Sequence, residues 1–178
     1  TQQEIKRKNE KLPKNIHWHF IGHLQRNKIK YIVPFVSMIH AVDSFELLSD
    51  IDRHAQKVDR IIPCLLQIHV AKEETKFGFT FDECRNMLAE EKWKDLQHVQ
   101  ISGLMCMASN VPDQAQIHQE FRSVYTFFNE IKQQYFKQDE QFCYRSWGMS
   151  SDYPIAVEEG CNMVRIGTKI FGSRPQKE

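Results

Sequence analysis

Apolar runs of strand length alternate with amphipathic stretches of helix length along most of this 178-residue chain. A run such as Ile61–Val70 is apolar nearly throughout, whereas a half-exposed strand would alternate between apolar and polar residues. Strands of this kind are typical of a parallel sheet that is covered on both faces. The expected strands are Ile16–Ile21, Val36–Val42, Ile61–Val70, Val99–Met107, Gln141–Ser146 and Met163–Ile166.

Helical patterns fill the intervals between these strands. The first fourteen residues are polar and helix-like. Asp43-Ser44 has the residue types of an N-cap, and Pro154 suits the first turn of a short helix. The expected helices are His23–Ile32, the stretch after Asp43-Ser44, a helix from Thr80 or Asp82 through Glu91, Asp113–Phe136 and Ser151–Glu159. Strand and helix therefore alternate to the end of the chain.

This alternation fits two α/β architectures, an open doubly wound sheet and a TIM (β/α)8-type barrel of which six strands are visible. The open dinucleotide-binding sheet carries G-x-G-x-x-G after its first strand, but the stretch here reads IGHLQRNK. A barrel places its phosphate site in the loops after its last two strands. Serines and a Gly-Thr pair occupy that part of the sequence, which favours the barrel.

Composition argues against several classes of function. Lys plus Arg is 24 and Asp plus Glu is 23, so the net charge of +1 gives no electrostatic reason to expect nucleic acid or a membrane surface. No apolar stretch approaches the length of a membrane span, and no signal peptide is visible. The five cysteines form no C-x-x-C motif, which favours a reducing cytoplasm over disulfides or a zinc site.

The stretch MVRIGTKIFG near the end of the chain contains the candidate site. Arg165 interrupts an apolar run, and a buried arginine is costly unless an anion or hydrogen-bond acceptor meets it. Gly167 and Thr168 follow at once and can offer backbone N–H groups to a phosphate, while Ser146 and Ser150 can add hydroxyl groups. Arg165 would then point toward the body of the ligand. The alternative is an ordinary turn, with Arg165 paired to a core carboxylate.

Three histidines, His17, His19 and His23, lie close together in the sequence. No carboxylate accompanies them in the sequence, so we expect hydrogen-bonded barrel histidines and no metal site.

Five spaced motifs together resemble one known family. They are HWHFIGHLQRNK (His17–Lys28), KEETKFGF (Lys72–Phe79), QISGLMCMA (Gln100–Ala108), SWGMSSDYPIAVEEG (Ser146–Gly160) and MVRIGTKIFG (Met163–Gly172). They resemble the pyridoxal-phosphate homeostasis proteins of the YggS/PROSC type, whose fold is like the N-terminal barrel of alanine racemase. The resemblance implies a protein that binds pyridoxal 5'-phosphate (PLP), acts in PLP homeostasis and has no established catalytic reaction or catalytic residue.

The resemblance also assigns roles to residues. Ser146 resembles the family's phosphate-binding serine, and Gly167 and Thr168 resemble its phosphate-cradling backbone amides. Arg165 resembles the arginine that hydrogen-bonds the pyridine nitrogen of PLP. An arginine there keeps that nitrogen unprotonated, because two donors cannot share one lone pair, and this weakens the electron-sink chemistry of the cofactor.

Further residues have roles that the sequence leaves open. Ile21 and Met105, at the ends of their strands, would either line the cofactor ring or belong to the barrel core. Lys76 would be a secondary contact to an anionic ligand. Lys72 and Lys169 lie just past strands, and we expect both on the solvated surface.

The chain also departs from the family pattern. In that family a lysine on the first barrel strand holds PLP as a Schiff base, and this strand would precede Thr1. We therefore expect a single PLP-binding barrel domain over residues 1–178 that is N-terminally incomplete, with about six of eight strands and no Schiff-base lysine. Trp147 and His69 replace a methionine and an asparagine, and Trp147 would either crowd the site or repack beside it.

Two other functions stay open on the sequence. One is an alanine-racemase-like PLP enzyme that acts on amino acids, which would use a second, β-rich domain. The other is a truncated or degenerate barrel that binds no PLP and acts through protein partners. For the leading hypothesis we expect a cytoplasmic monomer or weak dimer whose partner is PLP, and neither nucleic acid nor a membrane.

Overall fold

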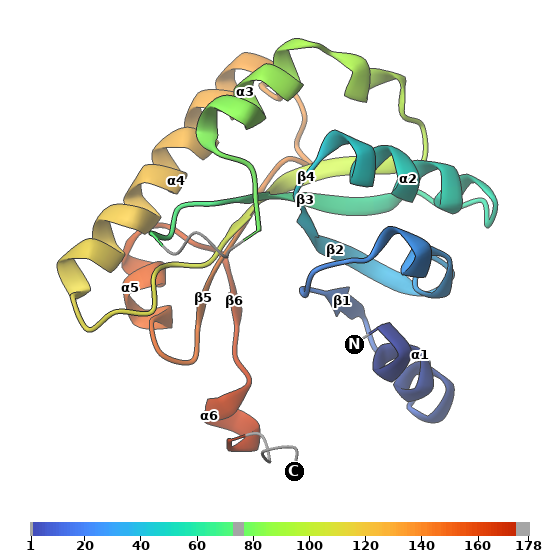
Figure 1. Cartoon of the computed structure of the whole chain (residues 1–178), viewed down its shortest axis with the longest axis horizontal. Coiled ribbons are helices and arrows are strands. Elements are labelled where there is room, and N and C mark those ends of the chain that lie inside the picture. Colours follow the sequence, from blue (N-terminus) through green and yellow to red (C-terminus); the bar gives the residue numbers. More distant parts are fainter. Residues whose placement is uncertain (1, 73–76, 174–178) are drawn as a thin grey trace.

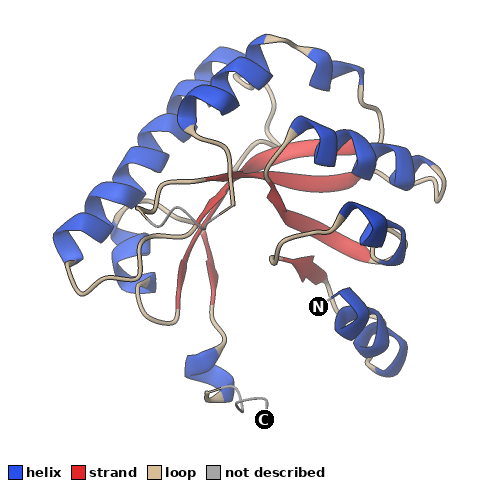
Figure 2. Cartoon of the chain, viewed as in Figure 1, coloured by secondary structure: helices blue, strands red, loops and turns tan. Residues whose placement is uncertain are grey.

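Six parallel strands form one sheet in which every strand lies beside its neighbour in the sequence. The computed structural model describes residues 2–72 and 77–173. The sheet curves into part of a barrel, and most of the helices lie on its outer side (Figure 1, Figure 2). Because the strand order never reverses, the doubly wound alternative is excluded and the six expected parallel strands are confirmed.

The elements alternate as the sequence predicts. The strands are β1 (Trp18–Phe20), β2 (Val36–Val42), β3 (Ile62–Ile68), β4 (Val99–Cys106), β5 (Tyr144–Met149) and β6 (Met163–Arg165). The α-helices are α1 (Gln2–Lys11), α2 (Phe45–Gln56), α3 (Phe81–Ala89), α4 (Gln114–Tyr135), α5 (Tyr153–Glu158) and α6 (Thr168–Phe171), and the 3-10 helices are η1 (Arg26–Tyr31) and η2 (Lys92–Asp95).

Two expected elements differ from the structure. The helix expected over His23–Ile32 is the 3-10 helix η1, which has no side-chain cap and no acidic residue in its first turn. The strand expected over Gln141–Ser146 starts later and runs further, as β5. The residues before it form a turn around Asp139, whose carboxylate accepts a hydrogen bond from the Gln141 N–H group. As a result Ser146 lies inside a strand, not at its end.

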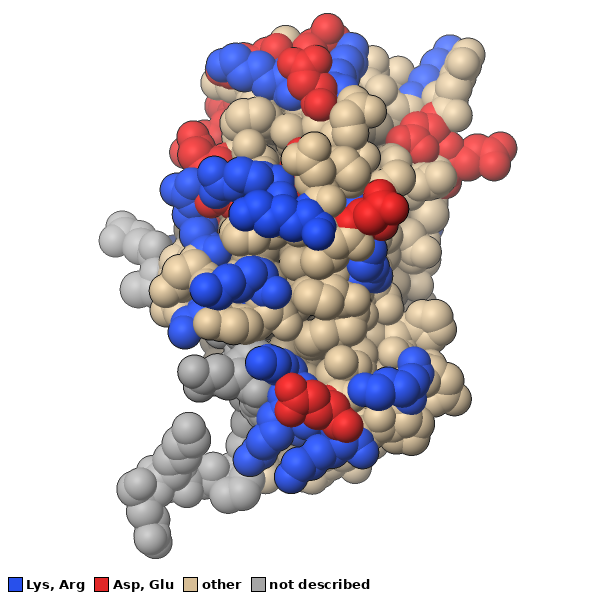
Figure 3. Space-filling view, turned by 90° about the vertical axis from the view of Figure 1, so that its right-hand side faces the viewer, with Lys and Arg blue, Asp and Glu red and all other residues tan. Residues whose placement is uncertain are grey.

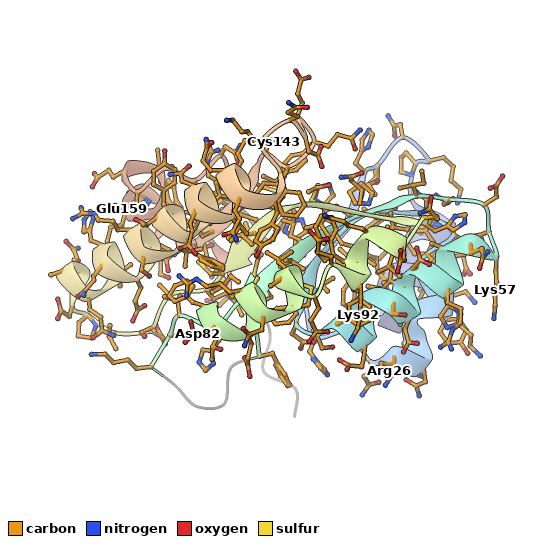
Figure 4. The ribbon with its side chains drawn as sticks, turned by 90° about the horizontal axis from the view of Figure 1, so that it is seen from above. Arg26, Lys57, Asp82, Lys92, Cys143 and Glu159 are labelled. Atoms are coloured by element: carbon orange, nitrogen blue, oxygen red, sulfur yellow. The ribbon has the colours of Figure 1, made fainter. Side chains whose placement is uncertain are left out.

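The main core lies between the sheet and the outer helices. Helix α2 starts at Ser44, whose hydroxyl accepts from the Leu47 N–H group, as the N-cap prediction requires. Helix α3 begins with a reciprocal capping box between Thr80 and Glu83. Viewed from above, α2, α3 and α4 lie over the sheet (Figure 4). Their apolar faces bury leucine, isoleucine and phenylalanine side chains against the strands.

Ion pairs join neighbouring outer helices at the surface. Arg85 on α3 donates to both carboxylate oxygens of Glu130 on α4. Glu159, which follows α5, accepts hydrogen bonds from Arg122 of α4 and lies 2.8 Å from the ring nitrogen of His118 on the same helix (Figure 4). These pairs fix how α3 and α5 sit against the long helix.

Basic side chains gather on the face that carries α1, η1 and α2 (Figure 3). Lys6, Lys28 and Lys30 each place their ammonium nitrogen between 5.1 and 5.8 Å from the centre of the Tyr31 ring. The cluster is local, since the whole chain carries a net charge of only +1. Among residues 2–72 and 77–173, none of the helices has the length and apolar character that a membrane span needs.

A smaller apolar cluster lies on the inner face of the sheet. It contains Met38, Ala41, Leu65 and Met105, all buried. Within the described ranges, β1 is paired only with β2 and β6 only with β5. The inner face therefore continues as a concave surface between β1 and β6.

Replacing Gly103 of β4 by alanine should destabilise the sheet strongly. Gly103 has φ of +149°, and a Cβ there would overlap the backbone carbonyl of Tyr144 on β5. We expect the free energy of unfolding in urea to fall by about 3 kcal/mol or more. Gly22→Ala is the control, because a Cβ at Gly22 would meet no atom within 4 Å, and it should change stability little. Equal effects of the two substitutions would contradict the close approach of β4 and β5.

Candidate functional site

A cavity of about 990 Å³ lies between the two edge strands, on the inner face of the sheet and toward the carboxyl ends of its strands. His19, Ile21 and His40 line it from the side of β1 and β2, and residues 149–151 and 163–169 line it from the side of β5 and β6. Figure 1 shows these edge strands, β1 in blue and β6 in orange-red, facing each other across the concave side of the sheet. This is the end of the sheet where parallel barrels place their ligands.

The segments that follow β5 and β6 form what we call the anion cradle, which consists of the Ser150 hydroxyl and the N–H groups of Gly167 and Lys169. The Gly167 N–H group donates to Ser150 Oγ at 3.2 Å, and the Lys169 N–H group donates to the same oxygen at 3.4 Å. Two backbone donors that converge on one oxygen are typical of an anion site. Gly167 and Thr168 both line the cavity, as predicted, although the second of these amide donors belongs to Lys169.

Gly167 leaves open space in front of these donors. A Cβ built at this position would meet no protein atom within 4 Å, so the contacts of the described residues do not themselves require glycine there. A ligand oxygen could therefore approach the backbone at this point without a steric barrier.

Arg165 is held by three hydrogen bonds inside the sheet. Its Nη1 donates to the carbonyl oxygen and to Oγ of Ser146, both at 2.8 Å, and its Nη2 donates to the Cys106 carbonyl oxygen at 2.9 Å. The guanidinium thus ties β6 to β5 and to β4. None of these acceptors is a carboxylate, unlike in the alternative considered from the sequence. Burial lowers the pKa of Arg165 from its ordinary value.

Ser146 lies beneath the cavity and does not line it. The residue is completely buried, and its Oγ lies 2.9 Å from His40 Nδ1 in addition to its contact with Arg165. This burial follows from its place in the middle of β5, where the sequence had placed the strand's end. The residue of this segment that reaches the cavity is Ser150, just after the strand. The phosphate contact assigned to Ser146 stays a prediction, and its present contacts are with protein groups.

Ile21 and Met105 lie in different environments in the structure. Ile21 lines the cavity and is 46% exposed, so its side chain is available to a ligand. Met105 is completely buried in the inner apolar cluster with Met38 and Leu65. Of the two roles left open for Met105, the structure supports the core role.

The expectation of hydrogen-bonded histidines holds for His19, whose Nδ1 lies 2.9 Å from His40 Nε2. His23 lies 3.6 Å from a carboxylate oxygen of Asp43, a partner that the sequence analysis did not identify. His40 was not predicted as a site residue either. The signal in the sequence was a polar residue inside the apolar run of β2. Over residues 2–72 and 77–173, no group of three His, Cys, Asp or Glu side chains is arranged to hold a metal.

The lysines differ in their relation to the cavity. Lys169 is exposed, as expected, and it also lines the cavity, with its ammonium nitrogen 4.6 Å from the centre of the Tyr153 ring. Lys72 donates to the side chain of Gln116 at the exposed surface, as expected. Lys76 lies outside the described residues. The six strands contain no lysine.

The two family substitutions lie away from the cavity lining. Trp147 is completely buried in the core between sheet and helices, so the structure supports repacking and not crowding of the site. The Trp147 Nε1 atom has no hydrogen-bond partner. The backbone N–H group of His69 donates to the Phe79 carbonyl oxygen and fixes the chain after β3.

The sheet, the cavity and the cradle define a barrel-type protein with a candidate anion site, and comparison with known proteins identifies the family. Residues 4–175 match the family model described as alanine racemase, N-terminal domain. The pyridoxal phosphate homeostasis protein of Aquifex aeolicus is 34% identical over 173 residues, which are 97% of this chain and 74% of that protein. The chain therefore belongs to the pyridoxal phosphate homeostasis proteins, within the family of alanine racemase N-terminal barrels.

Solved structures agree with this assignment. PipY of Synechococcus elongatus, solved without PLP, has a TM-score of 0.89 at 34% identity, over 97% of this chain and 79% of that one. A second structure of PipY, with PLP bound, has a TM-score of 0.83 over the same shares. Alanine racemase of Clostridium difficile has a TM-score of 0.72 over 98% of this chain and 43% of that one, and its 14% identity shows the fold alone. The expected α/β barrel of the alanine racemase N-terminal kind is thus confirmed.

Replacing Arg165 by methionine should destabilise the protein, because the carbonyl groups of Ser146 and Cys106 would lose their donor. We expect the free energy of unfolding to fall by about 2–4 kcal/mol in a urea titration. Lys169→Met is the matched control, since it also removes one positive charge from this segment but breaks none of these bonds. It should leave stability within about 0.5 kcal/mol of the original. Arg165→Met with the stability of the control would show that the three bonds are not formed in solution.

Proposed function

We propose that this protein binds PLP in the cavity between β1 and β6 and acts in PLP homeostasis without catalysing a reaction. The observation that carries the proposal is the anion cradle, where two backbone N–H groups converge on Ser150 Oγ beside open space. A phosphate oxygen would replace Ser150 Oγ as the acceptor of these N–H groups, and the serine hydroxyl would then donate to the phosphate. A relative whose structure holds PLP, and relatives named for PLP homeostasis and not for an enzyme, support the same function.

The residues present fit this cofactor. The cavity lies within the range of about 300–1,000 Å³ that is usual for small-molecule sites. The N–H groups of Gly167 and Lys169, with the hydroxyl groups of Ser150 and Thr168, would hold the phosphate. Ile21 supplies an apolar side chain for the ring. PLP, when bound, supplies an aldehyde and an electron-withdrawing pyridine ring.

Arg165 would meet the ring as a hydrogen-bond donor. A guanidinium has five N–H donors, and three of them are used within the protein. The others remain for an acceptor in the cavity, such as a pyridine nitrogen without a proton. Because arginine cannot accept a proton, it would keep this nitrogen unprotonated and so disfavour electron-sink chemistry.

The wider proposal concerns the setting in which the protein works. We propose that residues 1–178 act as one PLP-binding barrel domain in the cytoplasm, as a monomer or weak dimer without a nucleic-acid partner. The near-zero net charge supports the last point. Five free cysteines, three of them buried, support a reducing compartment.

Titration of the purified chain with PLP, followed by tryptophan fluorescence and checked by equilibrium dialysis, tests the proposal. Ser150→Ala should weaken PLP binding about 5- to 20-fold, through the loss of one hydrogen bond to a charged group. Inorganic phosphate should compete with PLP, and Ser150→Ala should also weaken the binding of inorganic phosphate. Thr126→Ala on the outer surface of α4, where the hydroxyl donates only to the Arg122 carbonyl oxygen, is the control and should bind normally.

Three results would contradict the proposal. One is saturable PLP binding that phosphate does not reduce and that Ser150→Ala does not change, since the ligand would then lie elsewhere. The second is racemisation of L-alanine by the PLP-loaded protein, which would indicate the enzyme alternative. The third is the absence of PLP binding, which would favour the alternative of a degenerate barrel that acts through protein partners.

A further inference from the structure

Four polar side chains form a continuous hydrogen-bonded row beneath and beside the cavity, which we call the histidine chain. It runs from Arg165 through Ser146 and His40 to His19. Successive partners are 2.8, 2.9 and 2.9 Å apart. The four residues come from β6, β5, β2 and β1, so the chain crosses the open side of the sheet from one edge strand to the other.

The donors and acceptors of the four side chains give the histidine chain a direction. Arg165 can only donate, so Ser146 Oγ must accept from it. The Ser146 hydroxyl has one hydrogen of its own, and His40 Nδ1 is the partner that can accept it. His40 then carries its proton on Nε2 and donates to His19 Nδ1. The remaining proton of a neutral His19 lies on Nε2.

This direction depends on a neutral His40, because an imidazolium ring has no acceptor nitrogen. His40 is 1% exposed, and burial, with the nearby His19 and Arg165, lowers its pKa to about 3. Burial and the neighbouring His17 also lower the pKa of His19. His40 in the histidine chain is therefore neutral at physiological pH, and the same causes favour the neutral form of His19.

We propose that His19 is a ligand-contact residue that presents its Nε2–H to the cavity as a fixed donor, and that His40 and Ser146 are positioning residues that hold both His19 and Arg165. The inference rests on PLP binding in this cavity. It adds to the anion cradle a second recognition point, on the opposite wall, for a hydrogen-bond acceptor of the ring portion of the ligand. A ligand that consists of phosphate alone would not use it.

The row also explains why these polar groups tolerate burial. Each buried nitrogen or oxygen within it has a partner, so none carries the cost of an unsatisfied polar group. The hydrogen bonds point in the same sense, away from the positive charge of Arg165, and such an arrangement strengthens each of them.

Paired substitutions at His40 test the positioning role. Glutamine can copy both functions of the ring, because its Oε1 can accept from Ser146 while its Nε2 donates to His19. Leucine can do neither. We expect His40→Leu to weaken PLP binding about tenfold and His40→Gln to retain most of it. Similar losses in both variants would overturn the positioning role.

Substitutions at the ends of the row separate ring recognition from phosphate recognition. We expect His19→Phe and Ser146→Ala each to weaken PLP binding about tenfold. The affinity for inorganic phosphate, obtained from competition, should be unchanged in both variants. Ser146→Ala keeps the backbone carbonyl that Arg165 also uses, so the variant should fold. His54→Gln on α2, outside the cavity lining, is the control histidine and should bind PLP normally. Unchanged PLP affinity in His19→Phe would overturn the ligand contact.

Nitrogen-15 NMR of the imidazole rings in the free protein tests the direction of the chain without any ligand. We expect both His40 and His19 to carry their proton on Nε2, and His40 not to titrate between pH 5 and 8. A proton on His40 Nδ1 would overturn the proposal. The expected tautomers together with absent PLP binding would instead refute the proposed function and leave the donor at His19 established.

Discussion

The Arg165 guanidinium is the interaction on which the rest of the site depends. It binds carbonyl groups of β4 and β5 from the inner side of the sheet, and so fixes the short strand β6 to its neighbours. The loop of the anion cradle begins directly after this strand. The histidine chain starts at the same guanidinium, which, together with a neutral His40, determines the direction of the later hydrogen bonds. One donor-only side chain thus orients the loop of the anion cradle on one wall and an imidazole on the other.

Much of the fold could be predicted because its signals are local. Near-continuous apolar runs such as Ile62–Ile68 mark buried parallel strands, and Ser44 and Thr80 mark helix starts through their own hydroxyl groups. The short elements η1, η2 and α6 were not predicted as they occur. Helices of four to six residues have too few turns to show a periodic pattern, and packing against the sheet decides whether they form.

The site was predictable where a short segment reveals it, and Ser150 and Ile21, both predicted as candidates, also line the cavity. Arg165, Gly167 and Thr168 are close in sequence, and all three reach the cavity. His40 depends on a partner 106 residues away, and no local pattern could reveal that contact. The place of Ser146 was missed for a related reason. The turn before β5 shifted the strand, and a shift of a few residues decides which serine is buried and which lies at the rim.

Ser150 has a consequence for the exchange of ligand. Its oxygen already satisfies the N–H groups of Gly167 and Lys169, so these donors are not left bare when an anion departs. As an anion leaves, the hydroxyl competes with it as the acceptor of these N–H groups, and this lowers the barrier to departure. An enzyme that must retain its cofactor through many turnovers would gain nothing from such a competitor. A protein that binds and releases its ligand reversibly needs no bare donors in the free state, and the Ser150 oxygen satisfies them there.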